Sequence, residues 1–170
     1  MTAPSPASVA PTLGYRLSLW LLAGTIICYS VGFMLWYSAT PLGLYPVLDG
    51  REMLHLAQQI ADQRLPAEPF YRAPVYPAAL ALLINSGLAE TELAFAARLL
   101  NLLLQLLSSI LVYILALRLW RRRTAAAISA LVFGLNPVVL HFAVDPLDIT
   151  AAISAMLVAV WSAAAVSDTH

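Results

Sequence analysis

Three aspartates have the residue type and the spacing to act on one polar group. Asp49 follows the apolar residues 41–48, while Asp145 and Asp148 stand three positions apart in Val-Asp-Pro-Leu-Asp-Ile. A carboxylate beside an apolar segment can act as a general base toward a hydroxyl or an amine, and it can also hold a metal ion. The alternative is structural, because Asp caps helices and favours short turns. We therefore treat Asp49 as the candidate catalytic residue and Asp145 and Asp148 as candidate metal ligands.

A second set of side chains could recognise a phosphate or a sugar. Arg72 and Tyr71 are adjacent, and Tyr76 follows in the same segment. Arginine pairs with phosphate, and an aromatic ring can line a sugar or a lipid head, although both side chains also anchor proteins at membrane interfaces. Arg98 near the start of an apolar stretch could bind phosphate or extend to the interface. The candidate substrate-binding residues are Arg72, Tyr71, Tyr76, Arg98 and His55, the last of which is expected to be solvated.

The elements that must position these residues are membrane-spanning helices. The 170 residues are 61% hydrophobic and only 11% charged, whereas soluble domains carry about 25% charged residues. About 20 residues of helix cross the hydrocarbon core, and only helices satisfy their own backbone in lipid. The stretches without Asp, Glu, Lys or Arg are long enough, or nearly so, to cross. They predict an all-α integral membrane protein of about four spans, at residues 17–37, 93–117, 124–144 and 149–166.

The distribution of arginine predicts the orientation of the chain. All nine basic residues are arginine, and the densest cluster comprises Arg118 and Arg121 to Arg123. The positive-inside rule places this cluster in the cytoplasm. Two predicted spans separate Arg16 from the cluster, so Arg16 lies on the same, cytoplasmic side. Residues 1–16 are therefore expected to form a disordered cytoplasmic N-terminus before a single transmembrane domain, residues 17–170. Residues 38–91 form an outer loop.

The outer loop contains two candidate interfacial helices. Residues 49–64 have apolar positions at helical spacing, with Asp49 at the cap position, and predict an amphipathic helix on the membrane surface. The four prolines of residues 65–77 exclude a regular helix there. The apolar run 77–88 is short for a crossing, which favours an interfacial or re-entrant helix. If it did cross, there would be five spans and the orientation of everything after it would be inverted.

The order of these segments resembles the N-terminal part of a GT-C glycosyltransferase, close to bacterial relatives of protein mannosyltransferases and aminoarabinose transferases. The resemblance rests on a first span followed by Tyr-Pro-Val-Leu-Asp-Gly-Arg-Glu, Leu-Ala-Gln-Gln-Ile-Ala, Glu-Pro-Phe-Tyr-Arg-Ala-Pro-Val-Tyr-Pro and Ala-Ala-Arg-Leu-Leu-Asn. It implies that Asp49 is the essential acid of the first outer loop and that Arg98 opens the second span. Asp145 or Asp148 would match a second-loop acid that holds a divalent metal ion in some members. Met53 departs from the pattern, since relatives often have Tyr there.

The resemblance implies a function as well as a fold. Such enzymes transfer a sugar from a polyprenyl-phosphate carrier to an acceptor outside the cytoplasmic membrane. Relatives usually continue through further spans, so the chain is expected to represent the N-terminal portion and to lack activity if truncated. The implied partners are a polyprenyl-phosphate-linked sugar, membrane lipids and further membrane subunits or spans. The implied location is the cytoplasmic (inner) membrane.

Two other functional classes compete with the glycosyltransferase hypothesis. A small non-enzymatic scaffold or assembly partner would use the outer loop to bind a neighbour and would not need acids from two loops. A transporter subunit would carry charges within its spans, and these spans hold almost none. Nucleic-acid binding is excluded, because the chain has no basic patch suited to it.

Overall fold

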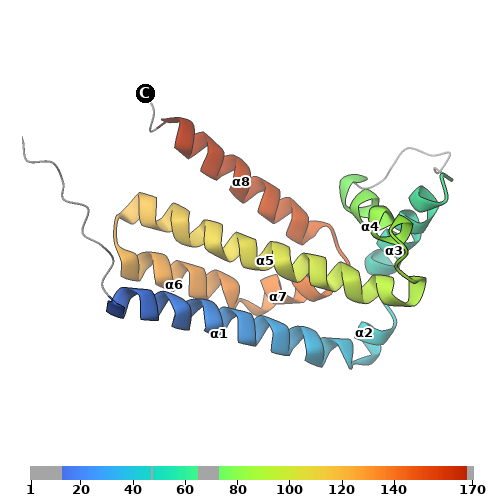
Figure 1. The fold of residues 1–170 in the computed structure, drawn as a ribbon, viewed down its shortest axis with the longest axis horizontal. Coiled ribbons are helices and arrows are strands. Elements are labelled where there is room, and N and C mark those ends of the chain that lie inside the picture. The colour runs from blue at the N-terminus through green and yellow to red at the C-terminus, as the bar shows by residue number, and fades with distance from the viewer. Residues whose placement is uncertain (1–12, 47, 65–72, 168–170) are drawn as a thin grey trace, which may run out of the picture.

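The computed structural model describes residues 13–46, 48–64 and 73–167, and every regular element within them is an α-helix (Figure 1). Three of these helices are long and apolar enough to cross a membrane: α1 (Leu13–Ser38), α5 (Glu90–Trp120) and α8 (Ile149–Ser167). A fourth crossing is available if the bent pair α6 (Arg123–Gly134) and α7 (Pro137–Val144) counts as one span. The predicted all-α membrane fold is confirmed for the described residues.

The bent pair differs from the straight span expected over residues 124–144. α6 ends at Gly134, α7 begins at Pro137, and their axes differ by 51°. The Asn136 side chain caps α7 by accepting a hydrogen bond from the Val138 amide at 2.9 Å. Proline at the first helical position needs no amide donor, but it cannot continue the preceding helix. The Asn-Pro pair therefore starts a new helix inside an otherwise uninterrupted apolar run.

α5 is the central helix of the bundle and packs against α1, α6, α7 and α8. Figure 1 shows α8 leaving the other helices toward its C-terminal end. The buried polar side chains of α5 recur every three or four residues and so lie on one side of the helix. They are Arg98, Asn101, Gln105, Ser108 and Ser109.

The polar side chains of α5 join the helices around it. Gln105 Nε2 donates to the Gly134 carbonyl at 3.1 Å, and Gln105 Oε1 accepts from Ser30 Oγ at 3.4 Å. Ser108 and Ser154 share a hydrogen bond of 2.8 Å. Buried polar groups need such partners, because an unpaired one is costly in an apolar medium. The same bonds therefore fix α1, α6 and α8 against α5.

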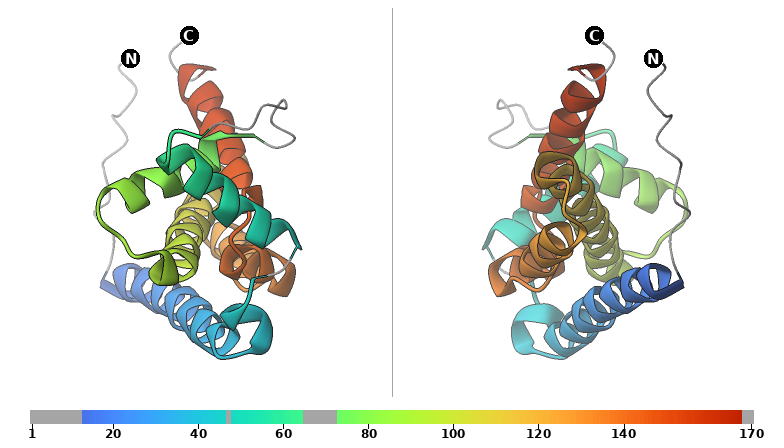
Figure 2. Two further views of the ribbon diagram at one scale, coloured as in Figure 1. Left: turned by 90° about the vertical axis from the view of Figure 1, so that its right-hand side faces the viewer. Right: turned by 90° about the vertical axis from the view of Figure 1, so that its left-hand side faces the viewer.

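Three short helices cover one end of the bundle, which we call the loop end. They are α2 (Pro41–Leu44), α3 (Leu48–Ala61) and α4 (Val75–Asn85), and the left view of Figure 2 shows α3 and α4 in front of the bundle. α3 packs on α4, and α4 packs on α5, around buried Met53, Ala57, Leu80 and Ala97. This apolar core holds α3 and α4 together on α5, whereas α2 packs on α1.

The bounds of the loop helices differ slightly from those expected. α3 starts at Leu48 and ends at Ala61, so Asp49 lies in its first turn rather than at its cap. α4 runs from Val75 to Asn85 instead of 77–88, so it starts two residues before Pro77, inside the segment that was expected to lack regular helix. Proline is tolerated in the first turn because the first amides of a helix have no intrahelical acceptor.

Candidate functional site

The loop end brings together two acids that are far apart in the sequence. A Cβ atom placed on Gly50 would lie 3.0 Å from Asp145 Oδ1 and 3.1 Å from Pro146 Cγ, so the start of α3 rests against the turn between α7 and α8. Asp49 is exposed in the first turn of α3, and its charge acts on Asp145. A carboxylate from the first loop and one from the second therefore share one site.

The surroundings of Asp145 favour its protonated form. Partial burial raises the pKa of the Asp145 carboxyl, and the negative charge of Asp49 raises it further. His141 and Arg98 act in the opposite direction and lower the pKa, but burial has the largest effect. Burial and a nearby like charge both disfavour an ionised carboxyl, so the Asp145 side chain holds its proton more tightly than a free aspartate does.

Arg98 lies near Asp145, and it donates hydrogen bonds to two backbone carbonyls. Its Nε donates to the Val144 carbonyl at 3.0 Å, and its Nη2 donates to the Gly43 carbonyl. Its Nη1 reaches Ser38 Oγ at 3.4 Å, and its guanidinium lies 5.7 Å from the centre of the Tyr37 ring. These carbonyls lie near the C-terminal ends of α2 and α7, where cations are favoured. The geometry thus gives Arg98 a structural role, while the expected phosphate contact stays a prediction.

Asn101 holds the turn that carries Asp145. Its Nδ2 donates to the carbonyls of Asp145 at 2.8 Å and Leu147 at 3.0 Å. Together with the bond from Arg98 to Val144, these contacts tie the end of α7 and the following turn to α5. Because three main-chain positions are fixed, the Asp145 side chain has a defined place at the site.

Tyr76 lies inside the protein rather than on the surface of the site. Its side chain is 4% exposed, and neither its hydroxyl nor Asn101 Oδ1 has a hydrogen-bond partner among the described residues. Burial raises the pKa of Tyr76 strongly, and Asp148 and Asp145 raise it further. The Asn101 side chain lies near the Tyr76 hydroxyl and lowers its pKa, although the two groups do not form a hydrogen bond of normal geometry. A direct contact between Tyr76 and a bound substrate stays a prediction.

Other predicted site residues lie elsewhere. His55 is exposed on α3, and Tyr71 and Arg72 lie outside the described residues. Asp148 directly precedes α8, and among the described residues no three His, Cys, Asp or Glu side chains gather at a metal site. Asp49, rather than Asp148, is the carboxylate whose charge acts on Asp145. Two carboxylates can share a divalent ion with a substrate phosphate, so a metal role for these acids stays a prediction.

Sequence reasoning missed two rings at the site. Tyr37 is buried at the end of α1, and the exposed His141 ring lies edge-on to it with centroids 6.0 Å apart. His141 also acts electrostatically on Asp145. Their positions in the sequence could have indicated them, because both polar aromatic side chains occur near the loop-end termini of otherwise apolar segments.

The family comparison covers the central part of the chain. Residues 77–144 match the family model described as dolichyl-phosphate-mannose-protein mannosyltransferase, which confirms the resemblance seen in the sequence. The matched segment includes most of α4, all of α5 to α7, and therefore Arg98, Asn101 and His141, but it spans less than half of the chain. No curated protein and no solved structure matches the chain significantly.

Proposed function

We propose that this chain belongs to the machinery that transfers a sugar from a polyprenyl-phosphate carrier to an extracytoplasmic acceptor, with Asp49 as the general base. The family match supports membrane glycosyltransferase activity in general. The observation that supports the specific site is the close approach of Gly50, the neighbour of Asp49, to the Asp145 carboxylate, together with the effect of the Asp49 charge on Asp145.

The proposed reaction is a single displacement at the anomeric carbon. The acceptor oxygen or nitrogen attacks this carbon, while the bond from the carbon to the phosphate oxygen breaks and its electron pair leaves with the polyprenyl phosphate. The Asp49 carboxylate accepts the proton of the acceptor. Asp145 orients sugar or acceptor hydroxyls by accepting hydrogen bonds, and Arg72 is the proposed partner of the leaving phosphate.

The proposed orientation places this reaction on the outer face of the cytoplasmic membrane. The loop end then faces outward, and Arg121, Arg122 and Arg123 lie at the opposite, cytoplasmic end together with the start of α1. A donor with a long isoprenoid tail stays in the bilayer, so its phosphate must meet the acceptor at the membrane surface. α3 and α4 cover the bundle at that level in this orientation.

The test measures transfer of a radiolabelled sugar from polyprenyl phosphate in membranes that contain the protein. We expect Asp49→Asn to lower transfer by about 100-fold, the lower end of the range typical for loss of a general base. Asp62→Asn is the matched control, because Asp62 is an exposed acid just after the same helix. Equal protein levels and equal elution in gel filtration must accompany the comparison.

A second variant tests the pairing of the two loops. Gly50→Ala would place a methyl group against Asp145 and Pro146, so it should separate the acids and reduce transfer. Gly32→Ala is its control, since a Cβ at Gly32 meets nothing within 4 Å. If Asp49→Asn and Asp62→Asn behave alike while complexes with other membrane proteins persist, the chain is a scaffold and the proposal is wrong.

A further inference from the structure

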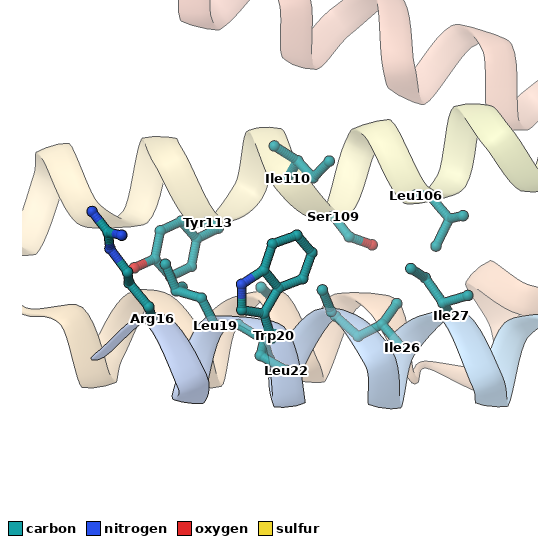
Figure 3. Close-up of a pocket in the computed structure, with 12 residues that line it drawn as sticks. Arg16, Leu19, Trp20, Leu22, Ile26, Ile27, Leu106, Ser109, Ile110 and Tyr113 are labelled. Atoms are coloured by element: carbon teal, nitrogen blue, oxygen red, sulfur yellow. The ribbon is translucent and has the colours of Figure 1, made fainter. Parts of the chain in front are cut away.

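A groove between α1, α5 and α6 lies outside the site at the loop end. It has a volume of about 610 Å³, and Figure 3 shows side chains of α1 and α5 pointing into the space between these helices. Most of the lining side chains are apolar, and none is acidic. The groove is lined by Arg16, Leu19, Trp20, Leu22, Ala23, Ile26, Ile27, Leu106, Ser109, Ile110, Tyr113 and Ala130.

The groove opens toward the outside of the bundle. Trp20 is 76% exposed and Ile110 is 57% exposed, although both side chains line it. α1 and α5 are candidate membrane spans, so the exposed parts of these residues face the hydrocarbon core of the bilayer. A lipid chain can therefore enter from the side without crossing a polar region.

One end of the groove carries positive charge and hydroxyl groups. Arg16 and Tyr113 both line this end, and the Tyr113 hydroxyl is 2.8 Å from that of Tyr15. The Arg123 guanidinium lies 4.0 Å from the centre of the Tyr15 ring. Two guanidinium groups thus flank a pair of tyrosines where the apolar groove ends, and we call this end of the bundle the arginine end.

We propose that this groove binds an anionic phospholipid, with its phosphate near Arg16 and Arg123 and one acyl chain along α1 and α5. Arginine forms strong, directional hydrogen bonds to phosphate, and basic pockets between membrane helices recognise anionic lipid heads. The charge complementarity favours a lipid with net negative charge over a zwitterionic one. The site is separate from the proposed sugar-transfer site, because Asp49 and Asp145 lie at the loop end and Arg16 lies at the opposite end of α1.

The test is native mass spectrometry of the detergent-purified protein, titrated with phosphatidylglycerol or phosphatidylcholine of the same chain length. We expect retention of one phosphatidylglycerol at concentrations where phosphatidylcholine is lost. Arg16→Gln should weaken this binding about fivefold, as expected for one basic residue near a lipid head. Arg122→Gln is the matched control, because Arg122 is exposed beside Arg123 and does not line the groove.

A second variant tests the apolar part of the groove without changing its charge. Ala23→Trp should fill the groove and displace the lipid while leaving both arginines in place. Circular dichroism and gel filtration of each variant establish that it is folded.

Three results would overturn the lipid site. One is equal retention of both lipids, and another is equal weakening by Arg16→Gln and Arg122→Gln. The third is displacement of phosphatidylglycerol by polyprenyl phosphate at much lower concentration, which would assign the groove to the sugar carrier.

Discussion

At the level of single residues, Arg98 shows how one charged side chain can organise the loop end. It is 4% exposed and donates to carbonyls near the C-terminal ends of α2 and α7, which come from distant parts of the chain. A guanidinium has five donors in a fixed plane, so it can serve several carbonyls at once, which lysine cannot do in the same geometry. The residue therefore links the two loops that carry Asp49 and Asp145.

Replacing Arg98 by methionine should destabilise the protein by about 3 kcal/mol, because buried carbonyls would lose their charged donor. The measurement is the unfolding midpoint in dodecyl maltoside, followed by circular dichroism. Arg51→Met serves as the control, since Arg51 is exposed on α3. An unchanged midpoint combined with weaker binding of polyprenyl phosphate would instead place Arg98 at the donor phosphate.

The raised pKa of Asp145 predicts how stability depends on pH. The folded protein holds the proton more tightly than the unfolded chain, whose carboxyl titrates near pH 4. The stabilisation from protonated Asp145 is complete below that pH and is lost as pH rises through the raised pKa. Asp145→Asn should therefore increase stability at pH values above the raised pKa of Asp145, and stability should then depend less on pH above about pH 4.

The measurement for Asp145 is the midpoint of detergent-induced unfolding at a series of pH values. Asp62→Asn is the comparison, because Asp62 is exposed and lies away from the paired acids. If the unfolding midpoint of Asp145→Asn changes with pH as steeply as that of the unmodified protein, another group causes the pH dependence.

At the level of helices, the break between α6 and α7 determines where the second loop lies. The break frees the Gly134 carbonyl from helical hydrogen bonding, and Gln105 donates to it at 3.1 Å. Without this donor, a carbonyl in an apolar environment would be left without a partner. The Gln105 side chain therefore stabilises the 51° bend between α6 and α7 by supplying the missing donor.

Gln105→Leu should test this arrangement, because it retains a similar volume but removes the amide donor. We expect a loss of about 2 kcal/mol in unfolding free energy, within the range for an unsatisfied buried acceptor. Ser129→Ala is the control, since the Ser129 hydroxyl donates to the Ala125 carbonyl of its own helix. Stability equal to that of the unmodified protein would mean that water satisfies the Gly134 carbonyl.

The sequence was sufficient to predict the membrane helices, since long apolar stretches have few other structures available. It also indicated Asp49 and Asp145 as acids of two loops on one side of the membrane. It did not predict the bend at Pro137, because an apolar run was counted as continuous across the proline. Nor did it predict the contacts of Arg98, because donors to distant carbonyls leave no local pattern.

At the level of the whole molecule, the two ends of the bundle have different chemistry. The loop end combines Asp49 on the short helix α3 with Asp145 in the turn before α8, whereas the arginine end combines Arg16 and Arg123 with an apolar groove. In the proposed orientation, the acids face the outer surface, where the acceptor is available, and the arginines face the anionic inner leaflet. This division depends on α4 staying on one side of the membrane.

Single-cysteine labelling can test that topology directly in a Cys28→Ala background, because Cys28 is the only cysteine. Asp62→Cys and Ser86→Cys should both react with a membrane-impermeant maleimide in intact cells, while Arg122→Cys should react only after permeabilisation. α4 has 11 residues, about 16 Å of helix, which is too short to cross a core of about 30 Å. If Asp62→Cys and Ser86→Cys were labelled from opposite sides, α4 would cross. The acids Asp49 and Asp145 would then face opposite surfaces, and a shared catalytic site would be impossible.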